Sequence, residues 1–174
     1  MKIPIGLEVF GDNVSHCSFD VTNKKSLIDS NVKVANFDGI KEKFSGKFKL
    51  KVKPKSADAF FEDAGVYVLA EFKNGEVDED DIIEKLYDSA IVLMEMYQKT
   101  PDWVRTNVDF ILIYRDEDIN IRARHKLMGL GSSKSSDPVW FYITKKAPGF
   151  IYRKIEELDA NTFSIRYGID NDHI

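Results

Sequence analysis

The segment from Ser56 to Gly75 carries two carboxylates and one ammonium group whose types and spacing suit chemistry on a phosphodiester. Asp58 lies in the aromatic run SADAFFED, and Glu71 and Lys73 end the apolar run VYVLAEFK. Side chains two residues apart on a strand project from one face, so Glu71 and Lys73 are expected side by side. An apolar strand gains nothing by burying two ions unless they are paired or have a task, because desolvating each one costs several kcal/mol.

The two runs are expected to pair as an antiparallel hairpin. Residues 56–63 and 66–73 flank residues typical of a turn. A loop of three or four residues between them would place Asp58 opposite Ala70 or Glu71. The orientation of Asp58 then depends on the register. The sequence therefore predicts that both carboxylates and the ammonium group converge at the open end of the hairpin, away from the turn.

Two interpretations of this cluster remain open from spacing alone. In the first, Asp58 and Glu71 hold Mg²⁺ or Mn²⁺ through hard oxygen ligands, and the backbone carbonyl of Phe72 adds another. The ion would acidify a bound water and neutralise a phosphodiester, while Lys73 orients or deprotonates the water or stabilises the developing charge. In the second, Lys73 forms a structural ion pair with Glu71 or Asp58 at the end of a sheet.

A strand with one lysine-covered face is expected just before the hairpin. In residues 47–53 apolar and basic residues alternate, which is the pattern of a half-buried strand. The apolar positions are Phe48, Leu50 and Val52, and the basic positions are Lys47, Lys49, Lys51 and Lys53. Pro54 has no backbone donor and is expected to end the strand. Weak helical periodicity over 26–44, interrupted by Asn36 and Gly39, predicts a helix before it.

The strongest helix of the chain is expected after the hairpin, from Asp78 to Lys99. Its first turn is acidic, which the helix dipole favours, and one face is apolar through Ile82, Ile83, Leu86, Ala90, Leu93, Met94 and Tyr97. A buried strand over 107–114 follows. Residues 115–138 are expected to form a basic loop with a short helix or strand, and 139–146 and 150–158 to form further strands.

Composition favours one intracellular domain covering residues 1–174. The chain is 43% hydrophobic, which is enough material for one core at this length. It has no apolar run long enough for a signal peptide or a membrane span, which predicts no membrane partner. The lone Cys17 suits a reducing, cytoplasmic compartment. The histidines and this cysteine do not have the spacing of a zinc site.

The charge of the chain is distributed unevenly. The net charge of −4 argues mildly against a nucleic-acid partner. However, residues 41–55 hold seven lysines against one acid, and residues 121–154 hold eight lysines and arginines against one acid, whereas 56–102 hold thirteen acids against three lysines. The basic stretches are either ordinary solvated surface or a phosphate-binding face. For the second alternative the nucleic-acid-binding candidates are Lys47, Lys49, Lys51, Lys53, Arg122, Arg124 and Lys126.

The run SADAFFEDAGVYVLAEFKNG, followed by an acidic-started helix and NVDFILIY, resembles the PD-(D/E)XK superfamily of metal-dependent nucleases, also called restriction-endonuclease-like. The resemblance covers residues 47–114. It implies an α/β (α+β) core, about residues 27–114, in the order helix, three antiparallel strands, helix and strand. Residues 115–174 would then be a C-terminal extension with additional strands. Ala57 departs from the pattern, because a proline often stands at that position.

By resemblance, Asp58 is the motif aspartate that opens the second strand, and Glu71 and Lys73 are the motif glutamate and lysine that end the third. These three would be the catalytic residues of a Mg²⁺- or Mn²⁺-dependent phosphodiesterase acting on DNA or RNA. Some members place a polar side chain from the following helix beside the site. Lys85 and Ser89 are the candidates here, unless they are only the flank of an amphipathic helix.

The same fold also hosts inactive proteins, because fold does not determine function. The alternative function is therefore a catalytically inactive nuclease-fold protein that serves as a binding or interaction module with a protein partner. The chain shows no separate recognition domain. If it is an enzyme, its specificity is expected from the 115–138 loop, from a homodimer or from a partner protein.

Overall fold

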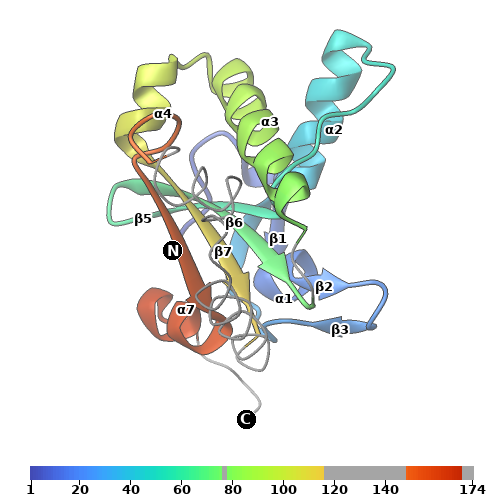
Figure 1. Cartoon of the computed structure of the whole chain (residues 1–174), viewed down its shortest axis with the longest axis vertical. Coiled ribbons are helices and arrows are strands. Elements are labelled where there is room, and N and C mark those ends of the chain that lie inside the picture. Colours follow the sequence, from blue (N-terminus) through green and yellow to red (C-terminus); the bar gives the residue numbers. More distant parts are fainter. Residues whose placement is uncertain (76–77, 116–147, 170–174) are drawn as a thin grey trace, which may run out of the picture.

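A six-stranded mixed sheet forms the middle layer of the structure, a computed structural model that describes residues 1–75, 78–115 and 148–169 (Figure 1). Its strand order is β1-β4-β5-β6-β7-β8. The strands are β1 (Gly11–Asn13), β4 (Lys33–Asn36), β5 (Ala59–Asp63), β6 (Val66–Lys73), β7 (Val108–Tyr114) and β8 (Lys154–Asp159). Neighbouring strands among β1, β4, β5 and β6 pair antiparallel, whereas β6, β7 and β8 run parallel. The chain is thus mixed α/β, as predicted.

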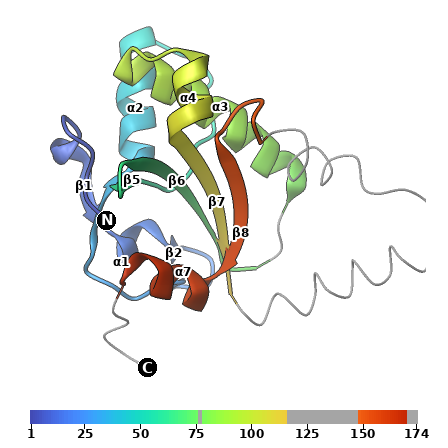
Figure 2. The same ribbon diagram turned by 90° about the vertical axis from the view of Figure 1, so that its left-hand side faces the viewer.

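Helices cover both faces of this sheet (Figure 2). One face carries α2 (Phe37–Phe48), α3 (Glu79–Tyr97) and α4 (Pro101–Asn107), and the other carries α1 (Val14–Cys17) and α7 (Ala160–Tyr167). A short 3-10 helix, η1 (Glu8–Phe10), precedes β1, and β2 (Phe19–Asp20) and β3 (Lys25–Ser26) form a separate two-stranded sheet. No helix in the described part of the chain is long and apolar enough to cross a membrane.

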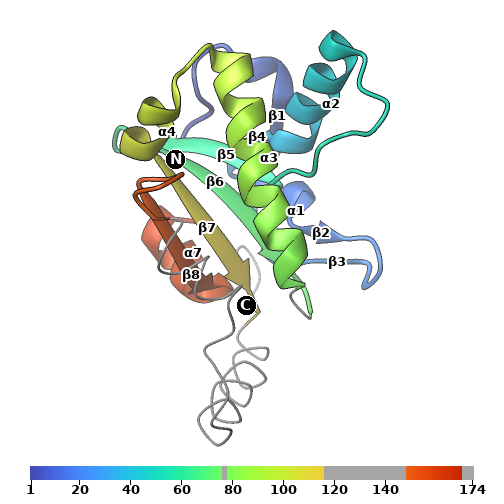
Figure 3. The same cartoon turned by 45° about the horizontal axis from the view of Figure 1, so that its top comes forward.

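Two hydrophobic cores lie on opposite faces of the sheet because successive side chains of a strand point to opposite faces. On β6, Leu69 joins the core under α2 and α3, whereas Val68 and Phe72 join the core under α7. Phe72 meets Phe163 of α7 edge-on, with ring centroids 5.9 Å apart. Helix α3 lies across its face of the sheet over β6 (Figure 3). Strand β6 is therefore buried on both sides, as its nearly continuous apolar sequence predicts.

The predicted hairpin is confirmed, with a tighter loop than expected. Strands β5 and β6 pair from Asp63↔Val66 to Ala59↔Ala70, so only Ala64 and Gly65 remain in the loop. Their φ angles are 46° and 83°, the positive values that a type I′ turn requires. Just before β5, the Asp58 N–H donates to the Ala70 carbonyl at 3.0 Å, which places Asp58 beside Ala70, one of the two positions that the sequence allowed.

The predicted strand over residues 47–53 is wrong. Asn36 caps α2, accepting a hydrogen bond from the Gly39 N–H at 3.2 Å, and Phe37, Ile40, Phe44 and Phe48 then recur at helical spacing. The last of these belongs to the helix rather than to an alternating strand. Lys49 ends α2 in the left-handed region (φ 52°), and its N–H and that of Leu50 donate to the last free carbonyls of the helix.

The strand that pairs with β5 is β4, which precedes α2. Residues 33–36 were predicted within a helix, but they form this strand, and the helix begins only at Phe37. The three antiparallel strands are therefore interrupted by α2, and the order differs from the predicted helix, three strands, helix and strand. Residues 33–36 include a β-branched residue, which favours a strand, and Asn36 is a good N-cap for the helix that follows. These local signals explain why a strand replaces the start of the predicted helix and why the order of elements differs.

Elements after the hairpin follow the sequence more closely. The predicted helix from Asp78 corresponds to α3, and the predicted buried strand corresponds to β7. Pro101 begins the short helix α4 instead of only ending α3, because proline is well tolerated in a first helical turn. The strand predicted over 150–158 is β8, which starts at Lys154.

Helix α7 was not predicted, although it carries capping signals at both ends. Asp159 accepts a hydrogen bond from the Thr162 N–H at 2.6 Å, and Gly168 follows the helix with φ 60°. The strand predicted over 139–146 and nearly all of the loop predicted over 115–138 lie outside the described residues.

The hairpin loop yields a stability prediction. Ala64 is exposed and has φ 46°, which is strained for a residue with a Cβ but suits asparagine. We expect Ala64→Asn to raise the free energy of unfolding by about 0.5–1 kcal/mol, because Asn-Gly is the preferred type I′ pair. Gly65→Ala is the opposite control and should lower it by about 1 kcal/mol, since a new Cβ there meets no neighbour and only backbone strain acts. Urea unfolding of both variants checks the pair, and a destabilised Ala64→Asn variant would contradict the turn assignment.

Candidate functional site

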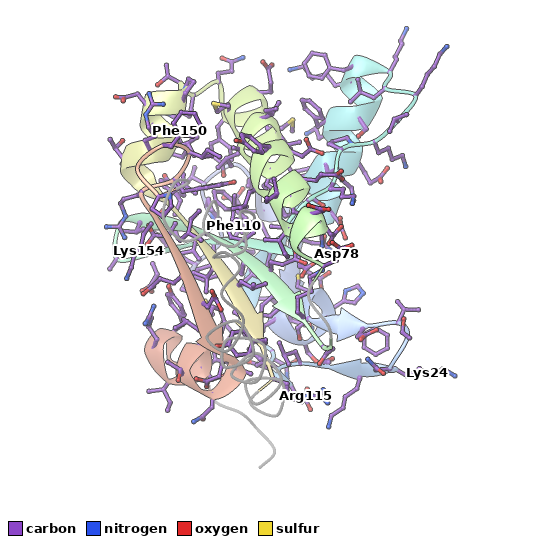
Figure 4. All side chains as sticks on the ribbon, viewed as in Figure 1. Lys24, Asp78, Phe110, Arg115, Phe150 and Lys154 are labelled. Atoms are coloured by element: carbon purple, nitrogen blue, oxygen red, sulfur yellow. The ribbon has the colours of Figure 1, made fainter. Side chains whose placement is uncertain are left out.

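Several elements bring their polar ends to one edge of the sheet. Strands β4 and β6 are parallel to each other across β5, so their C-terminal ends and the start of β5 meet there. Helices α2 and α3 begin at the same edge because each follows one of those strands. Figure 4 labels Asp78 at the start of α3 and Arg115 just beyond β7. Ligand sites commonly lie beyond the C-terminal ends of strands in α/β sheets.

Glu71 is the most deeply buried charged residue of this edge, with 1% of its surface exposed. Its Oε1 accepts a hydrogen bond from Lys85 Nζ at 2.6 Å and lies 3.1 Å from Lys73 Nζ. Its Oε2 is buried and has no hydrogen-bond partner among the described residues. Burial raises the pKa of Glu71, and the charges of Lys85 and Lys73 offset only part of that rise.

Asp58 lies just before β5, where its N–H donates to the Ala70 carbonyl at 3.0 Å and its carboxylate is near enough to Glu71 for the two charges to interact. Its Oδ2 accepts a hydrogen bond from the Phe72 N–H at 2.7 Å. Burial raises the pKa of Asp58 well above its ordinary value, and the negative charge of Glu71 raises it further. The carbonyl of Phe72 points to the same side of β6 as its N–H, so it also faces the Asp58 side.

Two ammonium groups approach the carboxylates from β6 and α3. Lys73 Nζ lies 3.0 Å from Asp81 Oδ2 as well as 3.1 Å from Glu71. Lys85 Nζ lies 4.0 Å from that same Asp81 oxygen. Burial alone would lower the pKa of Lys85, but Glu71, Asp58 and Asp81 outweigh it and raise the pKa. The structure therefore brings together Asp58, Glu71, Lys73 and Lys85 in one cluster of opposite charges.

Lys55 closes the outer side of this cluster. Its Nζ lies 2.9 Å from Asp81 and 2.8 Å from Glu84, and the Lys55 side chain is partly exposed. The structural ion pair that the sequence left open, between Glu71 and Lys73, is thus present as part of a larger network. It coexists with the arrangement of carboxylates that a cation site requires.

Ser89 occupies a different place from the one expected. Its hydroxyl is fully buried and accepts a hydrogen bond from the Ala57 N–H at 2.9 Å. It therefore holds the backbone next to Asp58 against α3 and has no hydrogen bond with a carboxylate. Its contribution is to position Asp58, whereas Lys85 contacts Glu71 directly.

Asp38, in the first turn of α2, is a residue of this edge that sequence reasoning missed. It is exposed, and it accepts hydrogen bonds from Ser56 Oγ at 2.6 Å and Lys41 Nζ at 2.5 Å. Burial opposes its ionisation, but these bonds prevail and leave the pKa of Asp38 below its ordinary value. Its charge in turn raises the pKa of Asp58. The N-cap at Asn36, two residues earlier, was the signal that placed Asp38 at a helix start.

The basic candidates of residues 47–53 do not form the lysine face of a strand. Lys47 lies in the last turn of α2 with its Nζ 4.8 Å from the centroid of the Phe48 ring, and Lys53 pairs with Glu42 at 2.6 Å. Helix α2 carries Lys47 away from the carboxylate edge at which the helix begins. The remaining candidates, Arg122, Arg124 and Lys126, lie outside the described residues.

The donor set of this edge fits a hard divalent cation. The carboxylates of Asp58 and Glu71 interact through their charges, and the Phe72 carbonyl points to the side of β6 on which its N–H binds Asp58. The Oε2 of Glu71 has no hydrogen-bond partner among the described residues, and burial raises the pKa of both acids, so their charged forms are disfavoured unless a cation is bound. Within the described residues no three histidine, cysteine or acidic side chains stand ready to hold a metal by themselves, so the carbonyl or water must complete the ligand set.

Comparison of the chain with protein-family models, with curated proteins and with solved structures finds no match. The restriction-endonuclease-like assignment therefore stays a prediction from the motif residues.

Asp58→Asn tests the electrostatic cost of the facing carboxylates. The folded protein holds the Asp58 proton more tightly than the unfolded chain, so wild-type stability falls relative to the variant as pH rises above about 4, the ordinary aspartate pKa. Without metal we expect an unchanged or higher Tm for Asp58→Asn at pH 7, and a smaller difference at pH 3.

Thermal unfolding in EDTA between pH 3 and 8 measures this difference. Asp12→Asn is the control with the opposite sign, because hydrogen bonds from Asn36 and the Asn13 N–H outweigh burial and leave the pKa of Asp12 below its ordinary value. That variant should lose stability at pH 7. Strong destabilisation by Asp58→Asn at pH 7 would instead make Asp58 a purely structural partner.

Proposed function

We propose that this protein is a metal-dependent phosphodiesterase that cleaves DNA or RNA with Mg²⁺ or Mn²⁺ bound at Asp58 and Glu71. The observation that carries the proposal is the buried Glu71 carboxylate, whose Oε2 has no partner among the described residues although the Asp58 charge acts on the same site. An unpaired charged oxygen in a protein interior is costly, and coordination of a cation removes that cost.

Two side chains and one backbone group would hold the ion. Asp58 and Glu71 supply charged oxygens, and Phe72 supplies a carbonyl, which together are ligands of the kind that hard cations prefer. When bound, the ion supplies the charge that neutralises a phosphodiester and acidifies a water. Ser89 keeps the Asp58 backbone against α3 through the Ala57 N–H, so the spacing of the two carboxylates is set by packing and not by the ion.

Lys73 would act on the water and on the phosphate. Its ammonium is fixed between Glu71 at 3.1 Å and Asp81 at 3.0 Å, at the end of β6. From this position it orients a water molecule and stabilises the negative charge that develops on the phosphate during cleavage. Asp81 therefore serves as a positioning residue, because it holds Lys73 without being part of the carboxylate pair.

The lysines of α2 and of the segment after it would bind the rest of the polyanion. Seven lysines lie in residues 41–55, which comprise most of α2 and the segment that leads from its far end back to the carboxylate edge. A basic track that continues from a metal site supplies sequence-independent affinity for phosphates. It accounts for binding without a separate recognition domain.

A second candidate function is a catalytically inactive binding module on the same scaffold. The observation that favours it is the neutralisation of Glu71 Oε1 by both Lys85 and Lys73, which gives an internal network that is stable without metal. In that case the cluster contributes specificity of folding rather than catalysis.

Two alanine variants separate the enzyme from the module. Lys73→Ala should keep divalent-metal binding, because Lys73 is not a ligand, and should lose cleavage by about 10²-fold or more, the scale of losing a general base or charge stabiliser. Glu71→Ala should lose both properties. The measurements are calorimetric titration with Mn²⁺ and cleavage of labelled single- and double-stranded DNA and RNA.

The metal-binding and cleavage measurements distinguish the enzyme from the inactive module. A wild type that binds no divalent ion at millimolar concentration would favour the inactive module. Cleavage that survives Glu71→Ala would point to a contaminating nuclease or to another site.

The basic track gives a salt-dependent prediction. Lys49→Ala and Lys51→Ala should weaken binding equally for all sequences and lower the slope of log affinity against log salt by about one unit for each phosphate that the variant no longer binds. Fluorescence anisotropy with labelled DNA and RNA at several salt concentrations measures the slope. Lys24→Ala removes the same charge at the tip of the β2–β3 hairpin (Figure 4) and should leave the slope unchanged. Binding that does not depend on salt would refute the basic track.

A further inference from the structure

Lys85 occupies the centre of the carboxylate cluster. Its Nζ lies 2.6 Å from Glu71 Oε1 and 4.0 Å from Asp81 Oδ2, and the charge of Asp58 also acts on it. Asp38 feels the charge of Lys85 from the rim. The start of β5, the end of β6 and the first turn of α3 thus direct acidic groups toward one ammonium group, which comes from the second turn of α3.

This ammonium group takes the place of a cation. Glu71 is nearly inaccessible to solvent and must be neutralised by protein atoms when no ion is present. Lys85 provides the shorter of its two contacts, 2.6 Å against 3.1 Å for Lys73. The compensation is incomplete, because both ammonium groups contact Oε1 and leave Oε2 without a partner among the described residues.

We propose that Lys85 is a resident counterion that a divalent ion must displace from Glu71, so that Lys85 competes with the metal and sets its affinity. The proposal rests on the proposed function, since it concerns the same ion at the same two carboxylates. It goes beyond that function by assigning to Lys85 a role in metal selection instead of in cleavage.

Asp81 provides a second carboxylate that the Lys85 ammonium group can contact. Asp81 stands one helical turn before it on α3, and its Oδ2 is already within 4.0 Å of the Lys85 ammonium. A change of side-chain rotamer therefore moves the ammonium from Glu71 toward Asp81 without any movement of the backbone. Lys73 differs from Lys85 because its ammonium group already contacts both acids, at 3.0 Å from Asp81 and 3.1 Å from Glu71. It can keep its contact with Asp81 while its contact with Glu71 changes.

Removal of the competing charge should tighten metal binding. We expect Lys85→Met to raise the affinity for Mn²⁺ by about tenfold or more, the scale of removing a unit charge a few ångströms from an ion near a protein surface. The variant should also lose stability in EDTA and regain it on addition of Mn²⁺, because its carboxylates then lack their counterion. The measurements are calorimetric titration and thermal unfolding with and without Mn²⁺.

Lys55→Met is the matched control. It removes the same charge from the same cluster, but the Lys55 ammonium pairs with Asp81 and Glu84 and is more exposed. We expect its Mn²⁺ affinity to change by less than about threefold, because solvent screens exposed charges. Equal gains for both variants would mean that only net charge matters, and would overturn the role of Lys85.

A measurement on the wild type covers the case in which Lys85→Met does not fold. In protein labelled with ¹⁵N at lysine side chains, titration with Mg²⁺ should shift the Lys85 Nζ signal and leave that of Lys55 in place. An unmoved Lys85 signal at saturating Mg²⁺ would overturn the proposal.

The outcomes also separate this inference from the function beneath it. Wild type that binds Mn²⁺ with the same affinity as Lys85→Met would overturn the displacement and leave the proposed function standing. Failure of both proteins to bind any divalent ion would overturn both. Binding by Lys85→Met alone would support displacement and show a site closed by its own lysine.

Discussion

The placement of one buried acid near another, Asp58 just before β5 and Glu71 on β6, is the constraint on which the rest of this edge depends. The two-residue turn at Ala64 and Gly65 sets the register of β5 against β6, and a slip by one residue would change which residues of the two strands lie side by side. Burial raises the pKa of both acids, and the negative charge of Glu71 raises the pKa of Asp58 further. The neighbouring ammonium groups oppose these shifts because they stabilise the charged forms of the acids. The turn therefore determines the register of the hairpin, and the register determines which charges lie near each other.

The carboxylate edge is supported by neutral contacts as much as by charge. Ser89 holds the backbone before Asp58, and the Phe72 N–H holds the Asp58 side chain, so Asp58 does not depend on a salt bridge for its position. The cations are then free to compensate charge without also fixing this part of the backbone. This division would suit the proposed ion site, because the carboxylates would keep their positions when counterions rearrange.

Much of this edge could be predicted from local pattern, and the rest could not. The apolar run before Glu71, the acidic start of α3 and the turn residues are local signals, and they located the hairpin and its acids. Residues 47–53 were predicted as a strand because Phe48 fits the alternation of a strand as well as the helical series that begins at Phe37. The N-cap at Asn36 is the signal that favours the helix. Asp38 could not be found by spacing, since it reaches the edge only because β4 pairs with β5 and turns directly into α2.

Phe72 gives the two faces of the sheet a mechanical connection. Its backbone N–H holds the Asp58 carboxylate on one side, while its ring packs against Phe163 of α7 in the opposite core. A shift of α7 thus reaches the acidic edge through a single residue of a buried strand, with no charged group involved. Substitutions in the apolar face of α7 are for this reason expected to change the position of the Asp58 carboxylate across the full thickness of the sheet.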